Sequence, residues 1–347
     1  MSSRALKGLA YLLLFGIGFT MAVPLVWMVS TSLKSGGDVL SFPPRWLPTE
    51  AVLVTVDGAA YPEATADVDG RSTRVAVLGQ TAQGARVRVL SSGEERVVPR
   101  DRVVPKRRVR LAWDNYARAW TALRPERGFL GLLRHADGFL VFYLNSVFVT
   151  VAITFGQVFT SSLAAFAFAR MRFPGRDALF LGYLATLMVP GVVLMIPLFA
   201  LFSRFRLTDT YWALILPGMF SAYGTFLLRQ FFITVPRDLE DAARMDGASP
   251  WSIYWNVILP LSKPALATLV TFTFLHYWND FMWPVIVIND LGKKTLPIGL
   301  AHFQGPYVTE WALLMAASVL VMLPVLVVFV AGQRYFIRGL VLSGLKA

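Results

Sequence analysis

Very few side chains in this 347-residue sequence are equipped for covalent or metal chemistry. Cysteine is absent, which excludes disulfides, thiol catalysis and cysteine metal sites. The three histidines, His135, His276 and His302, are far apart in the sequence, so neither a zinc site nor a nucleophile–base pair is indicated. A membrane-embedded enzyme is therefore disfavoured, and the remaining polar residues point to reversible binding.

Five residues could carry such binding because they place polar or amphipathic side chains within or beside long apolar stretches. They are Asn145, Gln157, Trp278, Asn279 and Asp280. Polar groups at membrane depth are functional candidates by default, and aromatic faces beside hydrogen-bonding groups suit sugars. We predict that the five residues line a substrate path. In the alternative interpretation, Asp280 pairs internally or lies at the outer interface, and the tryptophans form an aromatic belt.

The composition places these residues in a membrane protein. The chain is 56% hydrophobic and only 16% charged, with a mean hydropathy of +0.56, whereas soluble domains are about 45–50% apolar and about 25% charged. A membrane helix needs about 20 apolar residues. Runs of suitable length predict an all-α integral membrane protein with six membrane helices, at about 8–31, 139–168, 178–202, 211–232, 265–288 and 311–332. The first run is too long for a signal-peptide core, so we expect a retained anchor.

Short basic segments orient these helices. Arg4 and Lys7 precede the first run, three arginines lie between residues 170 and 176, and a basic tail covers residues 334–347. The positive-inside rule places all three segments, and therefore both termini, in the cytoplasm. Arg204 and Arg206 fall on the opposite side and disagree with this orientation.

Residues 34–138 then form an extracytoplasmic segment between the first helix (1–33) and a five-helix core (139–347). Within it, residues 50–110 show period-two patterns such as "TRVAVLG" and "ARVRVL", separated by Asp-Gly, Gln-Gly and Ser-Gly pairs. These features predict a small insertion of short antiparallel strands. The run "RVVPRDRVVPKRRVRL" is basic but lacks interleaved aromatic residues, so we expect no nucleic-acid partner. The segment "WDNYARAW" that follows predicts a short amphipathic helix.

A polar stretch, "EDAARMDGASPWSIYWNVILPLSKP" (240–264), interrupts the apolar core. Pro236 suits the first turn of a helix, and Glu240 can pair with Arg244 one turn later. Asp238, Glu240 and Asp241 would lie at the positive end of that helix. Gly247 is expected to end it with a positive φ.

A second short helix is predicted to begin at Ser249, as the N-cap, and Pro250. Its apolar face would carry Trp251, Tyr254, Val257 and Ile258, and Pro260 and Pro264 would turn the chain into the fifth membrane helix. We call residues 236–258 the knob. From these residues alone, two interpretations remain: the small side chains of the knob form a docking surface for a partner protein, or the knob is an ordinary helix lying at the membrane surface.

The same stretch resembles the signature of permeases in binding-protein-dependent ABC importers, the EAA motif: Glu-Ala-Ala, three residues, Gly, nine residues, Ile-x-Leu-Pro. Here it reads Asp241-Ala242-Ala243, Gly247 and Val257-Ile258-Leu259-Pro260, with aspartate for glutamate and valine for isoleucine. "NSVFVTVA", "SSLAAFAFARMRFPG" and "WNDFMWP" are similar to the second, shorter permease of maltose-type carbohydrate importers. Residues 50–110 have no counterpart in that pattern.

The resemblance implies a heteromeric sugar importer in a bacterial or archaeal inner membrane. Its partners would be a second permease, two ATPase subunits, an extracytoplasmic sugar-binding protein and membrane lipid. The ATPase-coupling residues would be Glu240, Asp241, Ala242, Ala243, Asp246, Gly247, Ala248 and Pro260. ATP and magnesium would bind the ATPase, because this chain has no GxxxxGK[ST] sequence and is expected to hold no cofactor. The basic tail would insert between the ATPase subunits or remain a plain cytoplasmic tail.

The alternative function is a self-contained secondary transporter of a small polar solute. Such a transporter needs a coupling-ion site built from internal carboxylates or broken helices. Asp280 is nearly alone as an acidic residue inside the predicted membrane helices. This scarcity argues against proton coupling.

Overall fold

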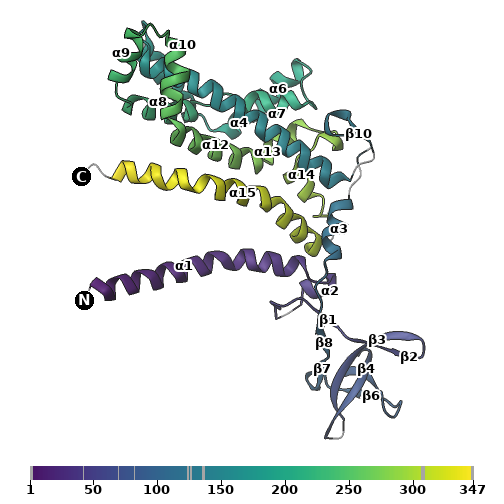
Figure 1. Cartoon of the computed structure of the whole chain (residues 1–347). Helices are drawn as coiled ribbons and strands as arrows, with labels where there is room; N and C mark the ends of the chain where they lie inside the picture. Colours follow the sequence, from purple (N-terminus) through teal and green to yellow (C-terminus); the bar gives the residue numbers. More distant parts are fainter. Residues whose placement is uncertain are drawn as a thin grey trace. The chain divides into compact units, whose positions relative to one another are not determined.

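The computed structural model describes residues 3–41, 43–68, 70–81, 83–122, 125, 127–134, 137–305 and 309–344 (Figure 1). His135 and the last three residues of the basic tail lie outside this set. The chain divides into two compact units. One contains Met1–Ala119 with Phe303–Val319, and the other contains Trp120–His302 with Leu320–Ala347.

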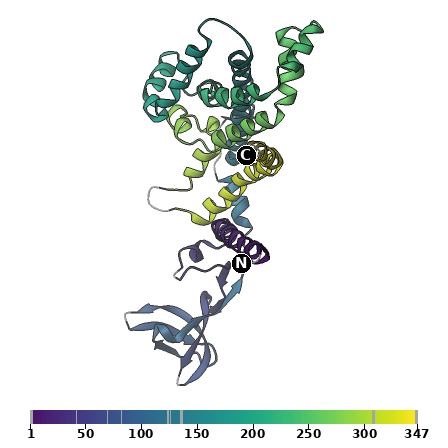
Figure 2. The same ribbon diagram turned by 90° about the vertical axis from the view of Figure 1, so that its left-hand side faces the viewer.

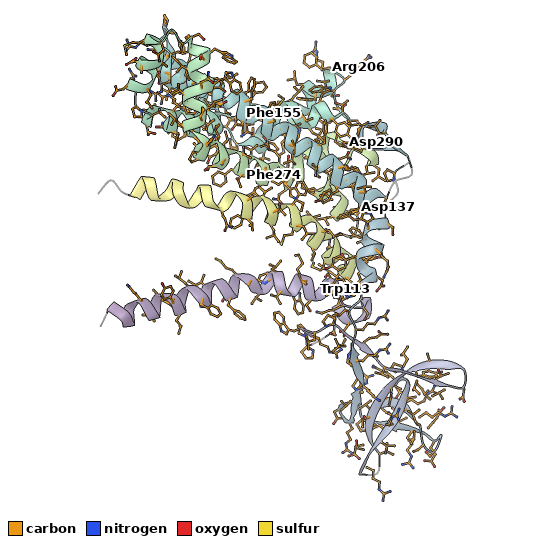
Figure 3. All side chains as sticks on the ribbon, in the orientation of Figure 1. Trp113, Asp137, Phe155, Arg206, Phe274 and Asp290 are labelled. Carbon is orange, nitrogen blue, oxygen red and sulfur yellow. The ribbon has the colours of Figure 1, made fainter. Side chains whose placement is uncertain are left out.

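The first unit begins with helix α1 (Ser3–Ser32), which is apolar on every side. Side chains project from it in all directions (Figure 3), and those of Leu12, Phe15, Phe19 and Met21 are exposed. A helix that is hydrophobic all round requires lipid or neighbouring helices as its surroundings. This agrees with the predicted membrane anchor.

Antiparallel strands fill residues 49–109, as the alternating pattern predicted. The strands are β1 (Thr49–Ala51), β2 (Leu53–Val56), β3 (Ala59–Val68), β4 (Arg71–Thr81), β5 (Gly84–Val89), β6 (Glu95–Val98), β7 (Val103–Pro105) and β8 (Arg107–Val109), with a 3-10 turn, η1 (Arg100–Arg102), before β7. Strands β2 to β6 form a curled meander in sequence order, β7 pairs with β3, and β1 pairs with β8 (Figure 2). Asp57 and Gly58 both have positive φ in the β2–β3 hairpin, as a two-residue type I′ turn requires.

This insertion has a core of its own, made of small and β-branched residues. Ala64, Val75, Val87 and Val98 are among the side chains buried inside it. Several charges of the basic run pair within the same unit: Lys106 with Glu63, Arg107 with Asp38, and both Arg108 and Arg110 with Glu50. Part of the positive charge in this run therefore has carboxylate partners within the same unit.

Asp38 fastens the insertion to the segment that follows α1. It lies in the short helix α2 (Gly36–Val39) and is almost fully buried. Its carboxylate contacts the guanidinium of Arg45 at 2.8 Å, pairs with Arg107 of β8, and accepts a 3.0 Å hydrogen bond from the Thr49 hydroxyl of β1. Burial by itself would raise the pKa of Asp38, but the Thr49 hydrogen bonds and the two arginines outweigh it and hold that pKa below its usual value.

The second unit is built around α4 (Gly138–Arg170), against which α7, α8, α12 and α14 pack. Its other helices are α5 (Arg176–Ala185), α6 (Gly191–Arg204), α7 (Tyr211–Gly218), α8 (Ala222–Thr234), α9 (Asp238–Met245), α10 (Pro250–Ile253), α11 (Leu259–Leu261), α12 (Lys263–Trp278), α13 (Met282–Val287) and α14 (Leu296–Ala301). Short elements complete it: β9 (Arg127–Gly128), β10 (Leu133–Arg134), the 3-10 turns η2 (Phe129–Gly131), η3 (Thr186–Met188) and η5 (Leu291–Lys293), and the π-helix η4 (Tyr254–Ile258). Helices α3 (Asp114–Thr121) and α15 (Trp311–Gly344) each contribute residues to both units.

Four helices in the described part of the chain are long and apolar enough to cross a membrane, or up to six if two bent helix pairs each count as one span. The predicted helix at 178–202 is one such pair, bent by 98° at Pro190, since proline lacks an N–H and forces the preceding residue out of helical geometry. The predicted helix at 265–288 was too long, because α12 ends at Trp278 and α13 is a separate short helix.

Replacing Asp38 with asparagine should lower the free energy needed to separate β1 and β8, the base of the insertion, by about 1.5–3 kcal/mol, the range for hydrogen bonds to charged groups. Trypsin at pH 7 should then cut after Arg107 or Arg108 faster than in the wild type. Because the folded-state pKa is lowered, the carboxylate contribution is complete at pH 7 and is lost as the pH falls below about 3.9 through that pKa. Asp57→Asn, at an exposed ion pair with Arg88, is the matched control and should leave cleavage at the base unchanged.

Candidate functional site

The knob begins with α9, whose first turn carries Asp238, Glu240 and Asp241 as predicted. The helix starts at Asp238, two residues after Pro236, so this proline precedes the first turn and does not occupy it. At the other end, Gly247 has φ +81°, which confirms the predicted positive φ.

The end of α9 is a complete Schellman motif. The N–H of Gly247 donates to the carbonyl of Arg244 at 3.0 Å, and the N–H of Ala248 donates to the carbonyl of Ala243 at 2.9 Å. Asp246, the C-cap, donates its N–H to the carbonyl of Ala242 at 3.1 Å. The small residues of the predicted motif therefore form the helix end itself.

The second half of the knob begins as predicted, with the Ser249 side chain accepting the N–H of Ser252 and Pro250 in the first turn. A π turn at Tyr254–Ile258 follows directly, and after α11, which contains Pro260, the chain bends by 78° into α12. Pro260 can donate no hydrogen bond to the preceding turn, and π turns and prolines are usual causes of such irregularity.

The π turn changes which side chains the knob buries. Tyr254 and Ile258 are buried as expected, but Ile253 is buried beside them, whereas Trp251 remains 56% exposed. The spacing of five residues between Ile253 and Ile258 matches one π turn, which places both on the inner face. The sequence prediction assumed a regular α-helix and therefore missed Ile253. It placed Trp251 on the apolar face with Tyr254, and the two ring centroids do lie 5.5 Å apart, but Trp251 stays exposed.

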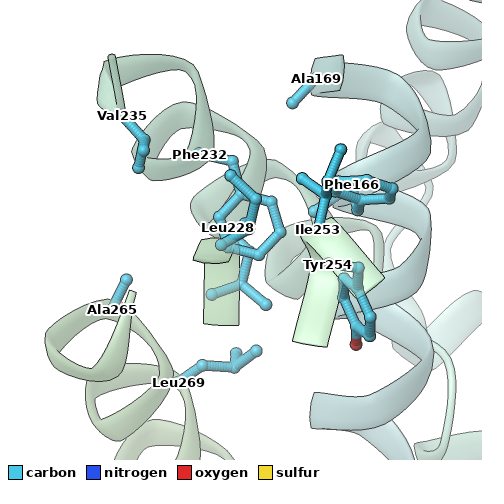
Figure 4. Close-up of a cluster of buried hydrophobic side chains, with 11 residues drawn as sticks. Phe166, Ala169, Leu228, Phe232, Val235, Ile253, Tyr254, Ala265 and Leu269 are labelled. Atoms are coloured by element: carbon cyan, nitrogen blue, oxygen red, sulfur yellow. The ribbon is translucent and has the colours of Figure 1, made fainter. Parts of the chain in front are cut away.

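Three helices of the second unit receive this inner face (Figure 4). Ile253 and Tyr254 pack into a cluster with Phe166 of α4, Phe232 of α8 and Leu269 of α12. The remaining members of the cluster are Ala165, Ala169, Leu228, Val235, Ile258 and Ala265. The hydroxyls of Tyr254 and Ser162 lie 2.7 Å apart. The knob is therefore seated on α4 and α8 as well as on α12.

A buried ion pair locks the knob to the last residue of α4. Arg170 and Glu240 approach to 2.9 Å between Nη1 and Oε1, with only 3% and 5% of their side chains exposed. Arg170 also donates to the carbonyls of Phe232 and Val235, the latter at 2.6 Å. The predicted partner Arg244 lies farther from Glu240, at 3.7 Å. Arg170 was assigned only to the positive-inside pattern, because sequence spacing contains no sign of a contact between residues so far apart.

The outer side of the knob is charged and open. A cavity of about 440 Å³ between the end of α4 and the knob is lined by Arg172, Arg237 and Arg244 beside Glu240 and Asp241. Among the described residues, the guanidinium groups of Arg172 and Arg237 have no hydrogen-bond or ion-pair partner. The Asp241 side chain is 64% exposed, and its ion-pair partner in the described part of the chain is Arg244, at 3.5 Å. These groups are available to a partner.

The predicted substrate-path residues do not form one cluster. Asn145 donates both amide hydrogens, to the carbonyls of Gly292 and Lys294 at 2.9 Å each, and its carbonyl accepts from the Tyr211 hydroxyl at 2.7 Å. Its side-chain amide thus holds the η5 turn against α4. Trp278 is buried, stacks on Phe274 and donates to a backbone carbonyl of α15.

The other three predicted residues lie elsewhere. Gln157 is buried, donates to the Thr273 hydroxyl at 2.9 Å, and lines a cavity with residues of α8 and α12. Asn279 is exposed and donates to the carbonyl of Leu275 at 2.7 Å, while Asp280 is half-buried in the break between α12 and α13. Only Gln157 therefore lines that cavity. No cluster of three potential metal ligands occurs among the described residues.

The sequence profile described as "Binding-protein-dependent transport system inner membrane component" matches residues 157–341, which contain the knob, its seat and the Gln157 cavity. The chain belongs to this family. It is therefore an inner-membrane transport component and a permease subunit, not itself an enzyme, as predicted. The membership does not favour the self-contained secondary transporter.

Individual relatives agree with this assignment. The chain is 37% identical over 218 residues to the arabinooligosaccharides transport system permease protein AraQ of Halalkalibacterium halodurans, covering 63% of this chain and 78% of the relative. It is 42% identical over 200 residues to the sn-glycerol-3-phosphate transport system permease protein UgpE of Pectobacterium atrosepticum, covering 57% and 71%. The fold is similar, with a TM-score of 0.66 and 20% identity, to a chain in the crystal structure of a bacterial ABC transporter involved in the import of alginate, an acidic polysaccharide; the similarity covers 97% of this permease and 98% of that chain.

Removing one member of the buried pair should destabilise this permease strongly. Arg170→Met leaves the Glu240 carboxylate buried without its principal partner, a change that typically costs about 3–5 kcal/mol. The double variant Arg170→Met/Glu240→Leu should recover part of the loss. The measurement is the thermal unfolding midpoint in detergent, with Arg176→Met as control, since Arg176 pairs with the exposed Asp177. Equal midpoints for Arg170→Met and Arg176→Met would contradict a structural role for the buried pair.

Proposed function

We propose that this permease forms half of the translocation pore of an ATP-driven sugar importer. A second permease would supply the other half, and an extracytoplasmic sugar-binding protein would deliver the solute. Two ATPase subunits would bind ATP and magnesium. The names of the relatives support this class of solute: one transports arabinooligosaccharides and another sn-glycerol 3-phosphate, a phosphorylated polyol.

The observation that carries the proposal is the construction of the knob. Its inner face is fixed to three helices by the apolar cluster and by the Arg170–Glu240 pair. Its outer face presents exposed Asp241, Met245 and Trp251. An element that is rigid towards the membrane helices and open on its outer face can pass a partner's movement into those helices. ATP-driven closure of the ATPase pair would push the knob, and α4, α8 and α12 would move with it.

The proposed topology places the knob and both termini in the cytoplasm and the strands β1 to β8 outside. This division follows the predicted segments 1–33, 34–138 and 139–347, and the basic residues near Lys7 and within 170–176 support it. The basic tail over 334–347 would lie beside the ATPase subunits. In this topology the insertion lies on the side where a binding protein would dock.

Co-purification tests the proposed assembly. The permease expressed with the products of its neighbouring genes should come with an ATPase and a second permease. Asp241→Lys should reduce ATPase recovery severalfold, because it reverses the charge of an exposed carboxylate in the first turn of α9. Asp177→Lys, an exposed carboxylate of α5 outside the knob, is the control. Uptake by the purified permease alone would refute the proposal.

Substitution of Gly247 tests coupling. A Cβ at this position would meet no other atom within 4 Å, so the cost of a side chain comes only from φ +81°, about 1–2 kcal/mol for most residues. Gly247→Val should separate ATP hydrolysis from uptake in the reconstituted complex, whereas Gly247→Asn should retain most coupling, since asparagine tolerates this conformation.

The control for Gly247→Val is Gly58→Val, which carries the same φ and equally open space in the β2–β3 hairpin. It should leave the ratio of uptake to ATP hydrolysis unchanged. Normal coupling in an assembled Gly247→Val complex would show that the shape of the knob is not required.

A further inference from the structure

A cavity of about 510 Å³ lies between α4, α8 and α12, in the second unit. Its volume is within the range of about 300–1,000 Å³ that is usual for small-molecule sites. Gln157, Ser221, Tyr223, Thr273, His276 and Tyr277 line it together with the apolar ring of Phe272. The lining thus combines hydrogen-bonding groups with flat aromatic faces.

The side of α12 that borders this cavity differs from a lipid-facing surface. His276 and Asn279 are exposed on α12 and at its end, one turn apart. By contrast, the exposed side chains of α6 between Val192 and Phe199 are all apolar. Exposed polar groups at membrane depth are expensive unless they face water or protein. Although Phe272 of α12 is exposed as well, His276 and Asn279 make this side of α12 more suitable for a pore surface than the wholly apolar side of α6.

Gln157 and Thr273 form the buried floor of the cavity. They are 5% and 3% exposed, and the Gln157 amide nitrogen donates to the Thr273 hydroxyl at 2.9 Å. Within the described chain, the side-chain carbonyl of Gln157 has no hydrogen-bond partner, and the Thr273 hydroxyl accepts the Gln157 amide but donates to no other group. The floor can therefore accept one hydrogen bond and donate another.

The charge of the cavity narrows the class of ligand. None of its lining residues is a lysine or an arginine, His276 is the one lining side chain that can take up a positive charge, and the nearest carboxylate in sequence, Asp280, is acidic. A phosphate or carboxylate held away from water needs a cation or several charge-assisted hydrogen bonds. A neutral, hydroxyl-rich solute needs only the donors, acceptors and ring faces that are present.

We infer that this cavity is a subsite for a neutral sugar unit, with Gln157 and Thr273 bonding one of its hydroxyls, and that it disfavours phosphate esters. The inference rests on the proposed import function and adds the chemical class of the solute to it. It also assigns direct solute contact to this permease.

The test uses the complete complex, reconstituted in vesicles with its binding protein at saturation. Uptake is measured for neutral pentose and hexose oligosaccharides, their monodeoxy analogues and glycerol 3-phosphate. Thr273→Val should slow uptake of the preferred sugar about three- to tenfold, the loss expected for one or two hydrogen bonds. The same change should have no effect on the analogue that lacks the bonded hydroxyl.

Two variants separate binding from folding. Thr271→Val changes an equally buried threonine of the same helix whose hydroxyl donates to the carbonyl of Ala267, so it should keep the wild-type rate and selectivity. Thr273→Ser keeps the hydroxyl and should restore both.

The possible outcomes separate the two proposals. Identical behaviour of Thr273→Val and Thr271→Val, or preferential uptake of glycerol 3-phosphate by the wild type, would overturn the subsite while leaving the importer intact. Absence of ATP-dependent uptake for every solute in an assembled complex would overturn the proposed function and the subsite with it.

Discussion

Arg170 is a cation buried at the end of a long apolar helix, and the arrangement of the knob follows from how this charge is satisfied. Removing a guanidinium from water costs several kcal/mol unless it is paired and hydrogen-bonded. Here the Glu240 carboxylate lies 2.9 Å from Nη1 of Arg170, and two carbonyls at the end of α8 accept its hydrogen bonds, although Nε of Arg170 and Oε1 of Glu240 have no hydrogen-bond partner among the described residues. The end of α4, the end of α8 and the start of α9 must therefore lie together, since separating any of them leaves a buried charge uncompensated.

This constraint explains how the knob can be ordered although it is short, as its proposed mechanical role requires. Isolated helices of eight residues are unstable in water, so α9 depends on tertiary contacts for its order. The ion pair holds its first turn, the Schellman motif fixes its last turn, and the apolar cluster around Tyr254 holds the helix that follows. In the proposed mechanism, a movement applied to the outer face would be distributed over three membrane helices, and α4 would carry it towards Gln157, which precedes Arg170 on the same helix.

The surfaces of the second unit complement this arrangement. The outward side of α6 is uniformly apolar over Val192–Phe199, whereas His276 and Asn279 break the apolar surface of α12. In a bilayer, such a contrast separates the lipid side of a helix bundle from the side that meets water or another protein. The strands β2 to β6 require neither lipid nor a pore for their stability, because they bury residues such as Val75 and Val87 in a core of their own.

Composition and local sequence pattern were sufficient to predict many of the helices, strands and turns of this protein. Long apolar runs predict membrane helices, and alternating residues around Asp57-Gly58 predict a hairpin. Gly247 and Ser249-Pro250 mark where one helix ends and the next begins. These predictions succeed because each signal depends on only a few neighbouring residues. The tertiary structure decided what depends on distant partners. It placed Arg170 against Glu240. It gave Asn145 and Trp278 hydrogen-bond partners inside the second unit. It ended α12 at Trp278, ten residues before the predicted helix ends. It also introduced the π turn that places Ile253 and Ile258 on the same buried face. Each of these outcomes is fixed by hydrogen bonds or packing between segments that the sequence does not place side by side.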